Sequence, residues 1–255
     1  MRIATFNTNS IRSRLPILAE WLPASGVDVL AVQETKVRDE EFPIADIEAM
    51  GYKAVFKGEK SYNGVAILSK SEPDEVAFGF SDGLAPAWDT RLALARFGDF
   101  WVLNTYVLQG KSIEHADYQA KKEFLRRASA LVSQHLGEKL VWVGDLNVAP
   151  TEIDVTNPAN KKDHVCFVKE LRDLFAEATA PLTDVFRKFH EGERLYSFFD
   201  YRVKNALDRN IGWRIDHILA TPAAAGLCTA CWIDTEPRRR EKPSDHTPML
   251  ADFDL

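Results

Sequence analysis

Short apolar segments bounded by turn-forming residues run along the chain and predict a fold dominated by β-strands. These segments are rich in Val, Ile, Leu and aromatic residues, and Gly, Asp, Asn or Pro separates them. The dipeptide Gly98-Asp99 divides two of them and predicts a hairpin turn. The predicted strands are Ile3–Phe6, Val27–Gln33, Gly64–Ser69, Leu92–Phe97, Phe100–Tyr106, Leu140–Gly144, Arg214–Ala220 and Met249–Phe253.

Helical spacing of apolar residues occurs in three segments. Arg14–Leu22, Tyr118–Leu136 and Phe167–Ala176 carry apolar side chains three or four residues apart, which predicts amphipathic helices. Gly137 is expected to cap the second helix. Many strands with few helices favour two packed sheets flanked by helices.

Composition narrows the class of protein. With 45% hydrophobic residues the chain can bury a large core, and without a linker or repeat we expect one domain over residues 1–255. No apolar stretch approaches the roughly 18 residues of a membrane span, so no membrane partner is expected. Met1 leads directly into a strand-like segment instead of a secretory signal. We therefore expect a cytoplasmic monomer.

The three cysteines give no clear metal or redox signal. Cys228 and Cys231 form a C-x-x-C in an apolar segment, but no second pair or histidine stands at zinc-ligand spacing. Two packed thiols are the expected outcome, with metal or redox use as the alternative.

The charge of the chain is acidic overall and basic in places. A net charge of −6 and a pI near 5.6 argue against non-specific nucleic-acid binding. However, Arg238–Arg240, Lys161–Lys162 and Arg202 lie beside the acidic motifs described next. A solvated surface remains an alternative for each basic run.

Polar residues follow the predicted strands and could converge on one site. Glu34 follows one apolar run, Asp145 follows another, Asp216 lies within a third, and His246 precedes the last strand. Carboxylates in these positions are unfavourable in a hydrophobic core, because each would need a hydrogen-bond or ion-pair partner if it were buried. The set suits a hard divalent cation and a phosphate ester.

Asp145 and Asn147 are two residues apart. In an extended chain they would project from one face, and Asn7 and Asn9 repeat the pattern. The alternative is an Asx-turn that closes the strand. For His246, the adjacent Asp245 is a poor partner in geometry, and Asp216 is the candidate acid that fixes the ring. An isolated Asp–His pair could equally be structural.

The residues as a set resemble the exonuclease III family of the endonuclease/exonuclease/phosphatase superfamily. The matching segments cover nearly the whole chain and read FNTNSIRSR, LAVQETK, YNGVAILSK, NTYV, GDLNVAP, FFDYR, GWRIDHIL and KPSDH. The resemblance implies a four-layer αββα sandwich. It also implies a Mg²⁺-dependent enzyme, with Mn²⁺ as a substitute, that hydrolyses phosphoester bonds in damaged double-stranded DNA at abasic sites, nicks and 3′ ends.

The same resemblance implies roles for individual residues. Glu34 binds the metal, with Asn7 and Asp245 close by. Asp145 orients or deprotonates the attacking water, and Asn147 holds the phosphate. His246 binds a phosphate oxygen and pairs with Asp216, while Tyr106 contacts the phosphate or assists the leaving group. DNA contact, pocket or support roles fall on Asn9, Lys36, Tyr62, Arg91, Asn160, Phe198, Trp213 and Ile215.

Three segments depart from the family pattern. Val107-Leu108-Gln109 lacks the usual Pro after Tyr106, which is expected to loosen a phosphate clamp, and Asp163 replaces a common Asn. His164-Val165-Cys166 replaces smaller residues and is expected to narrow the DNA cleft. We therefore predict stronger 3′-end processing than abasic-site incision. Two other hypotheses stay open: a phosphatase of a non-DNA ester, and a catalytically silent DNA-binding module.

Overall fold

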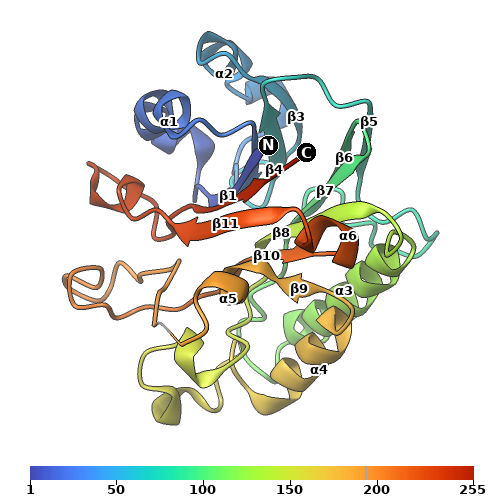
Figure 1. Ribbon diagram of the computed structural model, residues 1–255. Coiled ribbons are helices and arrows are strands. Elements are labelled where there is room, and N and C mark those ends of the chain that lie inside the picture. Colours follow the sequence, from blue (N-terminus) through green and yellow to red (C-terminus); the bar gives the residue numbers. More distant parts are fainter. Residues whose placement is uncertain (193) are drawn as a thin grey trace.

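The computed structural model describes residues 1–192 and 194–255, and it folds them into two six-stranded mixed sheets packed face to face (Figure 1). The first sheet contains β1 (Arg2–Asn7), β2 (Val29–Gln33), β3 (Lys53–Lys57), β4 (Val65–Ser69), β11 (Cys228–Ile233) and β12 (Met249–Phe253). The second contains β5 (Glu75–Phe78), β6 (Leu92–Phe97), β7 (Phe100–Tyr106), β8 (Lys139–Asp145), β9 (Thr183–Asp184) and β10 (Asp216–Ala220). The strand orders are β11-β12-β1-β2-β4-β3 and β5-β6-β7-β8-β10-β9.

Helices cover the outer surface of each sheet. These outer helices are α1 (Ile11–Ser25), α2 (Ile44–Ala49), α3 (Ala116–Ser133) and α4 (Lys169–Thr179). The short helices α5 (Val185–Phe189) and α6 (Pro222–Ala225) instead contribute residues to the apolar layer between the sheets. Figure 1 shows α1 and α2 on the side of the first sheet and α3 and α4 on the side of the second. The four-layer sandwich expected from the sequence is thereby confirmed.

All eight predicted strands are present, and five of them have shifted boundaries, three by one residue and two by two residues. The strand expected from Val27 begins at Val29, and the strand expected from Arg214 begins at Asp216. Strands β3, β5, β9 and β11 were not predicted. The first two are edge strands that each begin with an exposed charged residue, and β9 has only two residues. In β11 a register shift between Cys228 and Ala230 breaks the alternation on which the prediction depends.

The three predicted helices are present as α1, α3 and α4 with different ends, whereas α2, α5 and α6 were not predicted. Helix α1 is longer than predicted and includes Pro16 and Pro23. Helix α3 ends at Ser133 with Gln134 as its capping residue, so the predicted cap at Gly137 is wrong. None of the described helices is long and apolar enough to cross a membrane.

Three apolar layers hold the sandwich together. The central layer lies between the sheets and includes Ile3, Val102 and Val143. One outer layer packs Leu18 and other residues of α1 against the first sheet, and the other packs Phe124 and other residues of α3 against the second. The thiols of Cys228 and Cys231 are free and belong to the central layer, as packed side chains.

Two parallel strand pairs determine where the polar residues gather. β1 and β2 pair in parallel around α1, and β7 and β8 pair in parallel around α3. Polar side chains at the carboxyl ends of such strands meet at one edge of a sheet. Beneath this edge a buried hydrogen bond from Gln33 Nε2 to Asn104 Oδ1 (2.7 Å) links the two sheets. Asn104 in turn donates to the carbonyl oxygens of Val32 and Ala66, which fixes the sheets relative to each other.

Candidate active site

The predicted polar residues lie at the edge where the two sheets meet. Asn7 ends β1 and Glu34 follows β2 in the first sheet, while Tyr106 ends β7 and Asp145 ends β8 in the second. Asp216, the first residue of β10, is directly opposite Asp145 in the antiparallel ladder. Both sheets therefore contribute to one site.

The two motifs with polar residues two apart are Asx-turns. Asn147 N donates to Asp145 Oδ1 over 3.0 Å, and Asn9 N donates to Asn7 Oδ1 over 3.0 Å. Asn147 has a φ of 52° and Asn9 a φ of 46°, so neither continues an extended strand. The prediction that each pair projects from one extended face is therefore wrong. The amide of Asn147 instead donates one hydrogen bond to Val107 O (2.9 Å).

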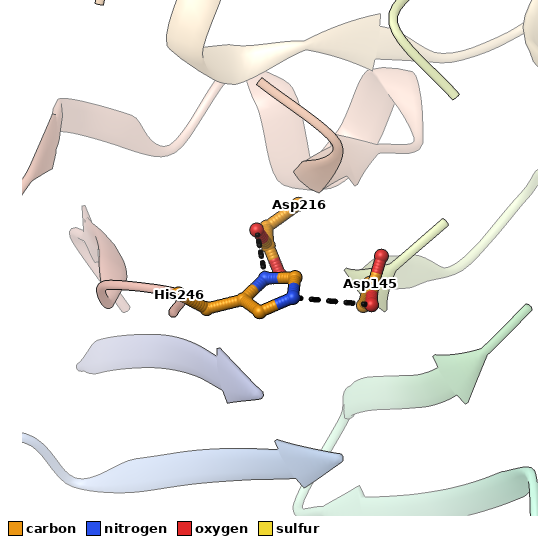
Figure 2. A group of neighbouring side chains, drawn as sticks. All are labelled: Asp145, Asp216 and His246. Atoms are coloured by element: carbon orange, nitrogen blue, oxygen red, sulfur yellow. Dashed lines mark hydrogen bonds and ion pairs between the residues drawn. The ribbon is translucent and has the colours of Figure 1, made fainter. Parts of the chain in front are cut away.

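His246 lies between two acids, as Figure 2 shows. Its Nδ1 contacts both carboxylate oxygens of Asp216, at 2.9 and 3.1 Å, and its Nε2 is 3.7 Å from Asp145 Oδ2. Burial alone would lower the pKa of this ring, but the charges of Asp216 and Asp145 outweigh it and raise the pKa to about 10. The ring is therefore an imidazolium at neutral pH.

Asp145 is a buried acid with an unusual proton affinity. Burial raises its pKa to about 7; the charge of His246 opposes this rise and that of Asp216 adds to it. Asn7 Nδ2 donates to Asp145 Oδ2 over 2.9 Å, which orients the carboxylate. A carboxylate with a pKa near 7 can accept a proton from water at neutral pH.

The oxygens of Glu34 face a cation. Lys36 Nζ is 2.7 Å from Glu34 Oε2 and also donates to Asn9 Oδ1. Burial would raise the pKa of Glu34, but Lys36 outweighs it and the pKa is lowered. Asn7 Nδ2 donates to Glu34 Oε1 over 2.8 Å, and Asn9 Nδ2 donates to Asp245 Oδ1 over 3.0 Å. These carboxylate and amide oxygens, already arranged around an ammonium group, are the donor type that Mg²⁺ or Mn²⁺ prefers.

A second acidic group is less suited to a metal. Donor atoms of Asp145, Asp216 and His246 lie within 4.8 Å of one another. However, an imidazolium has no lone pair to offer, and Asp216 is already its hydrogen-bond partner. The oxygens around Glu34 therefore suit a divalent cation better than these three residues do, and the three residues are suited to proton transfer.

Tyr106 and Arg91 form a stacked pair beside Glu34. The guanidinium carbon of Arg91 is 4.7 Å from the centre of the Tyr106 ring, and its Nη1 donates to Tyr106 O over 3.1 Å. Burial, together with Glu34 and Asp145, raises the pKa of the Tyr106 phenol well above its usual value. Tyr106 is therefore a neutral hydroxyl that can donate a hydrogen bond, and Arg91 supports it from the side.

These residues open into a pocket of about 350 Å³. Phe198, Trp213 and Ile215 line it, as the resemblance implied, together with His164. The His164 ring lies 4.6 Å from the Trp213 ring, and Cys166 N donates to His164 Nδ1 over 3.1 Å. Burial and the charges of Lys161 and Lys121 lower the pKa of His164 to about 4, so the ring is neutral.

The expectation that His164, Val165 and Cys166 together narrow the cleft needs correction. Val165 was expected to narrow the cleft together with its neighbours, but it is buried in the outer apolar layer and does not line the pocket. Of the three residues in the segment, His164 and Cys166 line the cavity.

Some predicted residues lie away from the pocket, and others were missed. Tyr62 is 71% exposed and Asn160 is also exposed, so both are surface residues in this structure. Gln109 lines the pocket, although in the sequence it was named only as part of a segment that departs from the family pattern. Lys121 was not considered, although it lies three residues after Tyr118 and four before Leu125, on the buried side of α3. That spacing could have identified it.

Comparisons with known proteins identify relatives along the whole chain. The model of the Endonuclease/Exonuclease/phosphatase family matches residues 4–246. Exodeoxyribonuclease III from Haemophilus influenzae is 33% identical over 268 residues, covering 99% of this chain and 100% of the relative. An AP endonuclease from Archaeoglobus fulgidus has a TM-score of 0.96 and 46% identity, with both chains fully covered. The 3′ phosphatase NExo from Neisseria, bound to product DNA hairpin, has a TM-score of 0.92 and 33% identity, with both chains fully covered.

Proposed function

The chain belongs to the endonuclease/exonuclease/phosphatase family, and from this premise we propose that it is a metal-dependent phosphoesterase of DNA repair. Its reactions are hydrolysis at abasic sites, 3′–5′ exonuclease cleavage and removal of 3′-phosphates. One observation carries the proposal: a buried carboxylate with a pKa near 7 lies 3.7 Å from a buried imidazolium. A proton acceptor and a positive hydrogen-bond donor side by side suit attack of water on a phosphate ester.

The two groups have complementary roles in that reaction. Asp145 accepts the proton of the attacking water, because its pKa is matched to neutral pH. His246 donates from Nε2 to a phosphate oxygen and stabilises the charge that develops there. Asp216 holds the ring in the orientation that points Nε2 toward the cavity.

The remaining site residues bind the phosphate and the cation. Asn147 uses one amide hydrogen for Val107 O and keeps the other for a phosphate oxygen. Tyr106 offers its hydroxyl to the phosphate or to the leaving oxygen. Glu34 and Asp245, with Asn7 between the carboxylates of Glu34 and Asp145, would hold the Mg²⁺ or Mn²⁺ ion, which supplies Lewis-acid neutralisation of phosphate charge.

Basic residues around the pocket favour DNA as the substrate. Lys161 and Arg202 line the cavity, and Arg14 and Arg238 both contact Tyr201 beside Asp245. Among the described residues neither Arg14 nor Arg238 contacts a carboxylate at ion-pair distance. The charge of the half-buried Arg238 is therefore available to a phosphate backbone despite the acidic net charge, whereas Arg14 is buried. We also propose that the protein acts on DNA as a monomer.

His164 favours a specialisation within this activity. Its ring lies 4.6 Å from the Trp213 ring, and both line the pocket, so His164 reduces the space left for a sugar turned out of the helix. A 3′-phosphate at a nick or end reaches Asp145 and His246 without entering that space. We therefore propose that 3′-end processing is stronger than incision at an internal abasic site.

A substrate panel tests both parts of the proposal. The wild-type protein with Mg²⁺ is assayed on a duplex with an internal abasic site, a nick bearing a 3′-phosphate and a blunt duplex. We expect 3′-phosphate removal to be fastest. No hydrolysis of any of the three would refute the proposed function.

Substitution of His164 by Gly tests whether the volume of the His164 ring limits abasic-site incision. We expect His164→Gly to raise abasic-site incision at least tenfold and to leave 3′-phosphate removal within threefold of wild type. Asp163→Gly is the matched control, because it adds the same backbone freedom at an exposed neighbour. Equal effects of the two substitutions would mean that loop flexibility and not ring volume limits incision.

A further inference from the structure

Lys121 is a buried lysine that the reaction described above does not use. It lies on α3 with no exposed surface, on the same side of the helix as Tyr118 and Leu125. Among residues 1–192 and 194–255 no carboxylate lies within ion-pair distance of its ammonium group. A charge of this kind is costly to bury and is retained only where its hydrogen bonds are satisfied.

The ammonium group has one backbone carbonyl for each of its hydrogens. Lys121 Nζ donates to Asn147 O over 2.7 Å, Val165 O over 2.8 Å and Gln109 O over 3.1 Å. The Cys166 sulfur lies 3.8 Å away. Three acceptors around one nitrogen fit the protonated form, because a neutral amine would turn its lone pair toward one of the carbonyl oxygens.

Each of the three carbonyls belongs to a different loop of the active site. Gln109 follows β7 and Tyr106, Asn147 follows β8 and Asp145, and Val165 lies between the two pocket residues of its loop. No other element of the described chain donates to all three loops. A single buried group thus connects the segments that surround the cavity.

The Asn147 carbonyl is the contact closest to the chemistry. Asn147 adopts a left-handed φ of 52° while its N–H bonds to Asp145 and its amide bonds to Val107 O. The hydrogen bond from Lys121 fixes the remaining polar group of this residue's backbone. Rotation of the Asn147 peptide would therefore move both the amide and the carboxylate that the Asx-turn connects.

The Gln109 contact explains how its loop stays in place without the expected proline. Gly110 has a φ of 102°, and a Cβ at this position would lie 3.5 Å from the Lys121 side chain. Val107 N also donates to Asp145 O over 2.9 Å, which extends the β7–β8 ladder. These contacts hold the loop in place and argue against the loosened phosphate clamp expected from the sequence.

We propose that Lys121 is a positioning residue for hydrolysis, which holds the Asp145–Asn147 turn and the two neighbouring loops in the arrangement that the reaction needs. The inference rests on the proposed function. Lys121 touches neither the cavity nor the cation-binding residues, so it acts only through the groups it holds. Displacement of catalytic groups by about 1 Å costs on the order of 100-fold in rate, whereas binding of an extended DNA strand depends on many contacts.

The test compares Lys121→Met, Lys121→Arg and Lys122→Met with wild type. Met keeps the length of the side chain without its donors, and Arg keeps the charge and donors. Lys122 is the matched control: it is the next residue on α3 and also largely buried, but its Nζ pairs with Glu170 (2.6 Å) on α4, away from the cavity. Melting temperature, kcat and KM are measured on a 3′-phosphate nick with Mg²⁺, at least 15 degrees below each variant's transition.

We expect kcat of Lys121→Met to fall about 10- to 100-fold with KM within threefold of wild type. Lys121→Arg should recover part of that loss. Lys122→Met should keep kcat within twofold of wild type, even if its melting temperature falls as much as that of Lys121→Met. Should Lys121→Met fail to fold, Lys121→Gln takes its place with the same criterion.

Three results would overturn the inference: unchanged kcat in the variant, a rise in KM alone, or an equal loss of kcat in Lys122→Met. Each would leave Lys121 as an ordinary packing residue while the wild type still hydrolyses DNA. Absence of hydrolysis by the wild type would instead overturn the proposed function, so the two failures are distinguishable.

Discussion

Replacement of Asp216 by Asn should move the alkaline limit of activity toward neutral pH. The pKa of His246 is raised from 6.5 to about 10, and after burial, which opposes the rise, Asp216 is its largest cause. This difference corresponds to roughly 5 kcal/mol in favour of the charged ring. With a neutral Asn in place of Asp216, burial lowers the pKa of His246 and the charge of Asp145 raises it. These two effects oppose each other, so the pKa of His246 should return toward about 6.5.

The expected effect on rate follows from the fraction of charged ring. In the wild type the ring stays protonated up to about pH 10, so between pH 7 and 9 the rate should rise by no more than about twofold, as Asp145 completes its deprotonation. In Asp216→Asn the rate should fall about tenfold for each pH unit above 7, which gives a further loss of about 100-fold at pH 9. Below pH 6 the two proteins should differ by a smaller, constant factor, because the ring is charged in both.

Single-turnover hydrolysis of a 3′-phosphate nick between pH 5.5 and 9.5 measures this effect, and an NMR titration of the His246 ring measures the pKa directly. Asp200→Asn is the control, since Asp200 lines the pocket but bonds to Arg202 and not to His246. Parallel pH profiles for wild type and Asp216→Asn would show that the charge of the ring does not depend on Asp216, and the reasoning would fail.

Other predictions concern the cation, the base and the substrate. EDTA should abolish hydrolysis and Mg²⁺ or Mn²⁺ should restore it, because the ligands around Glu34 are oxygens; turnover in excess EDTA would contradict the cation assignment. Asp145→Asn should bind DNA normally, by fluorescence anisotropy, and lose about 10²–10⁴ in single-turnover rate, because an amide cannot accept the water proton; near-normal turnover would exclude Asp145 as the base. His246→Ala should lose about 10²–10³ in the same assay. DNA affinity should fall with salt with a log–log slope of about −3 to −5, and a slope near zero would indicate a small substrate.

The sequence predicted the site residues better than their geometry. Motif residues such as Glu34, Asp145 and His246 follow apolar strands, and strand ends are where side chains leave the core. The bonds between them depend on turns that spacing alone leaves open. Asn147 is an example: its sequence context is compatible with both an extended strand and an Asx-turn, and only the folded structure distinguishes them.

Elements missed from the sequence share a physical reason. β3 and β5 are edge strands, whose charged and exposed residues hide the alternation of a half-buried strand. β11 contains a bulge that shifts the alternation by one residue. Lys121 was missed because a lysine in a helical pattern is usually assigned to the solvent side, although its neighbours Tyr118 and Leu125 are buried.

The buried Asp145–His246 pair also sets how the free protein responds to alkali. Both groups bind protons more tightly when folded: the pKa of Asp145 rises from 3.8 to about 7 and that of His246 from 6.5 to about 10. Folding stability from Asp145 is thus fully present below pH 3.8 and lost as pH rises through 7, and stability from His246 is lost between 6.5 and 10. Through these two groups, the arrangement that readies the protein for hydrolysis therefore costs folding stability as the pH rises from neutral to alkaline, and a bound cation would offset this cost by compensating the acidic charge.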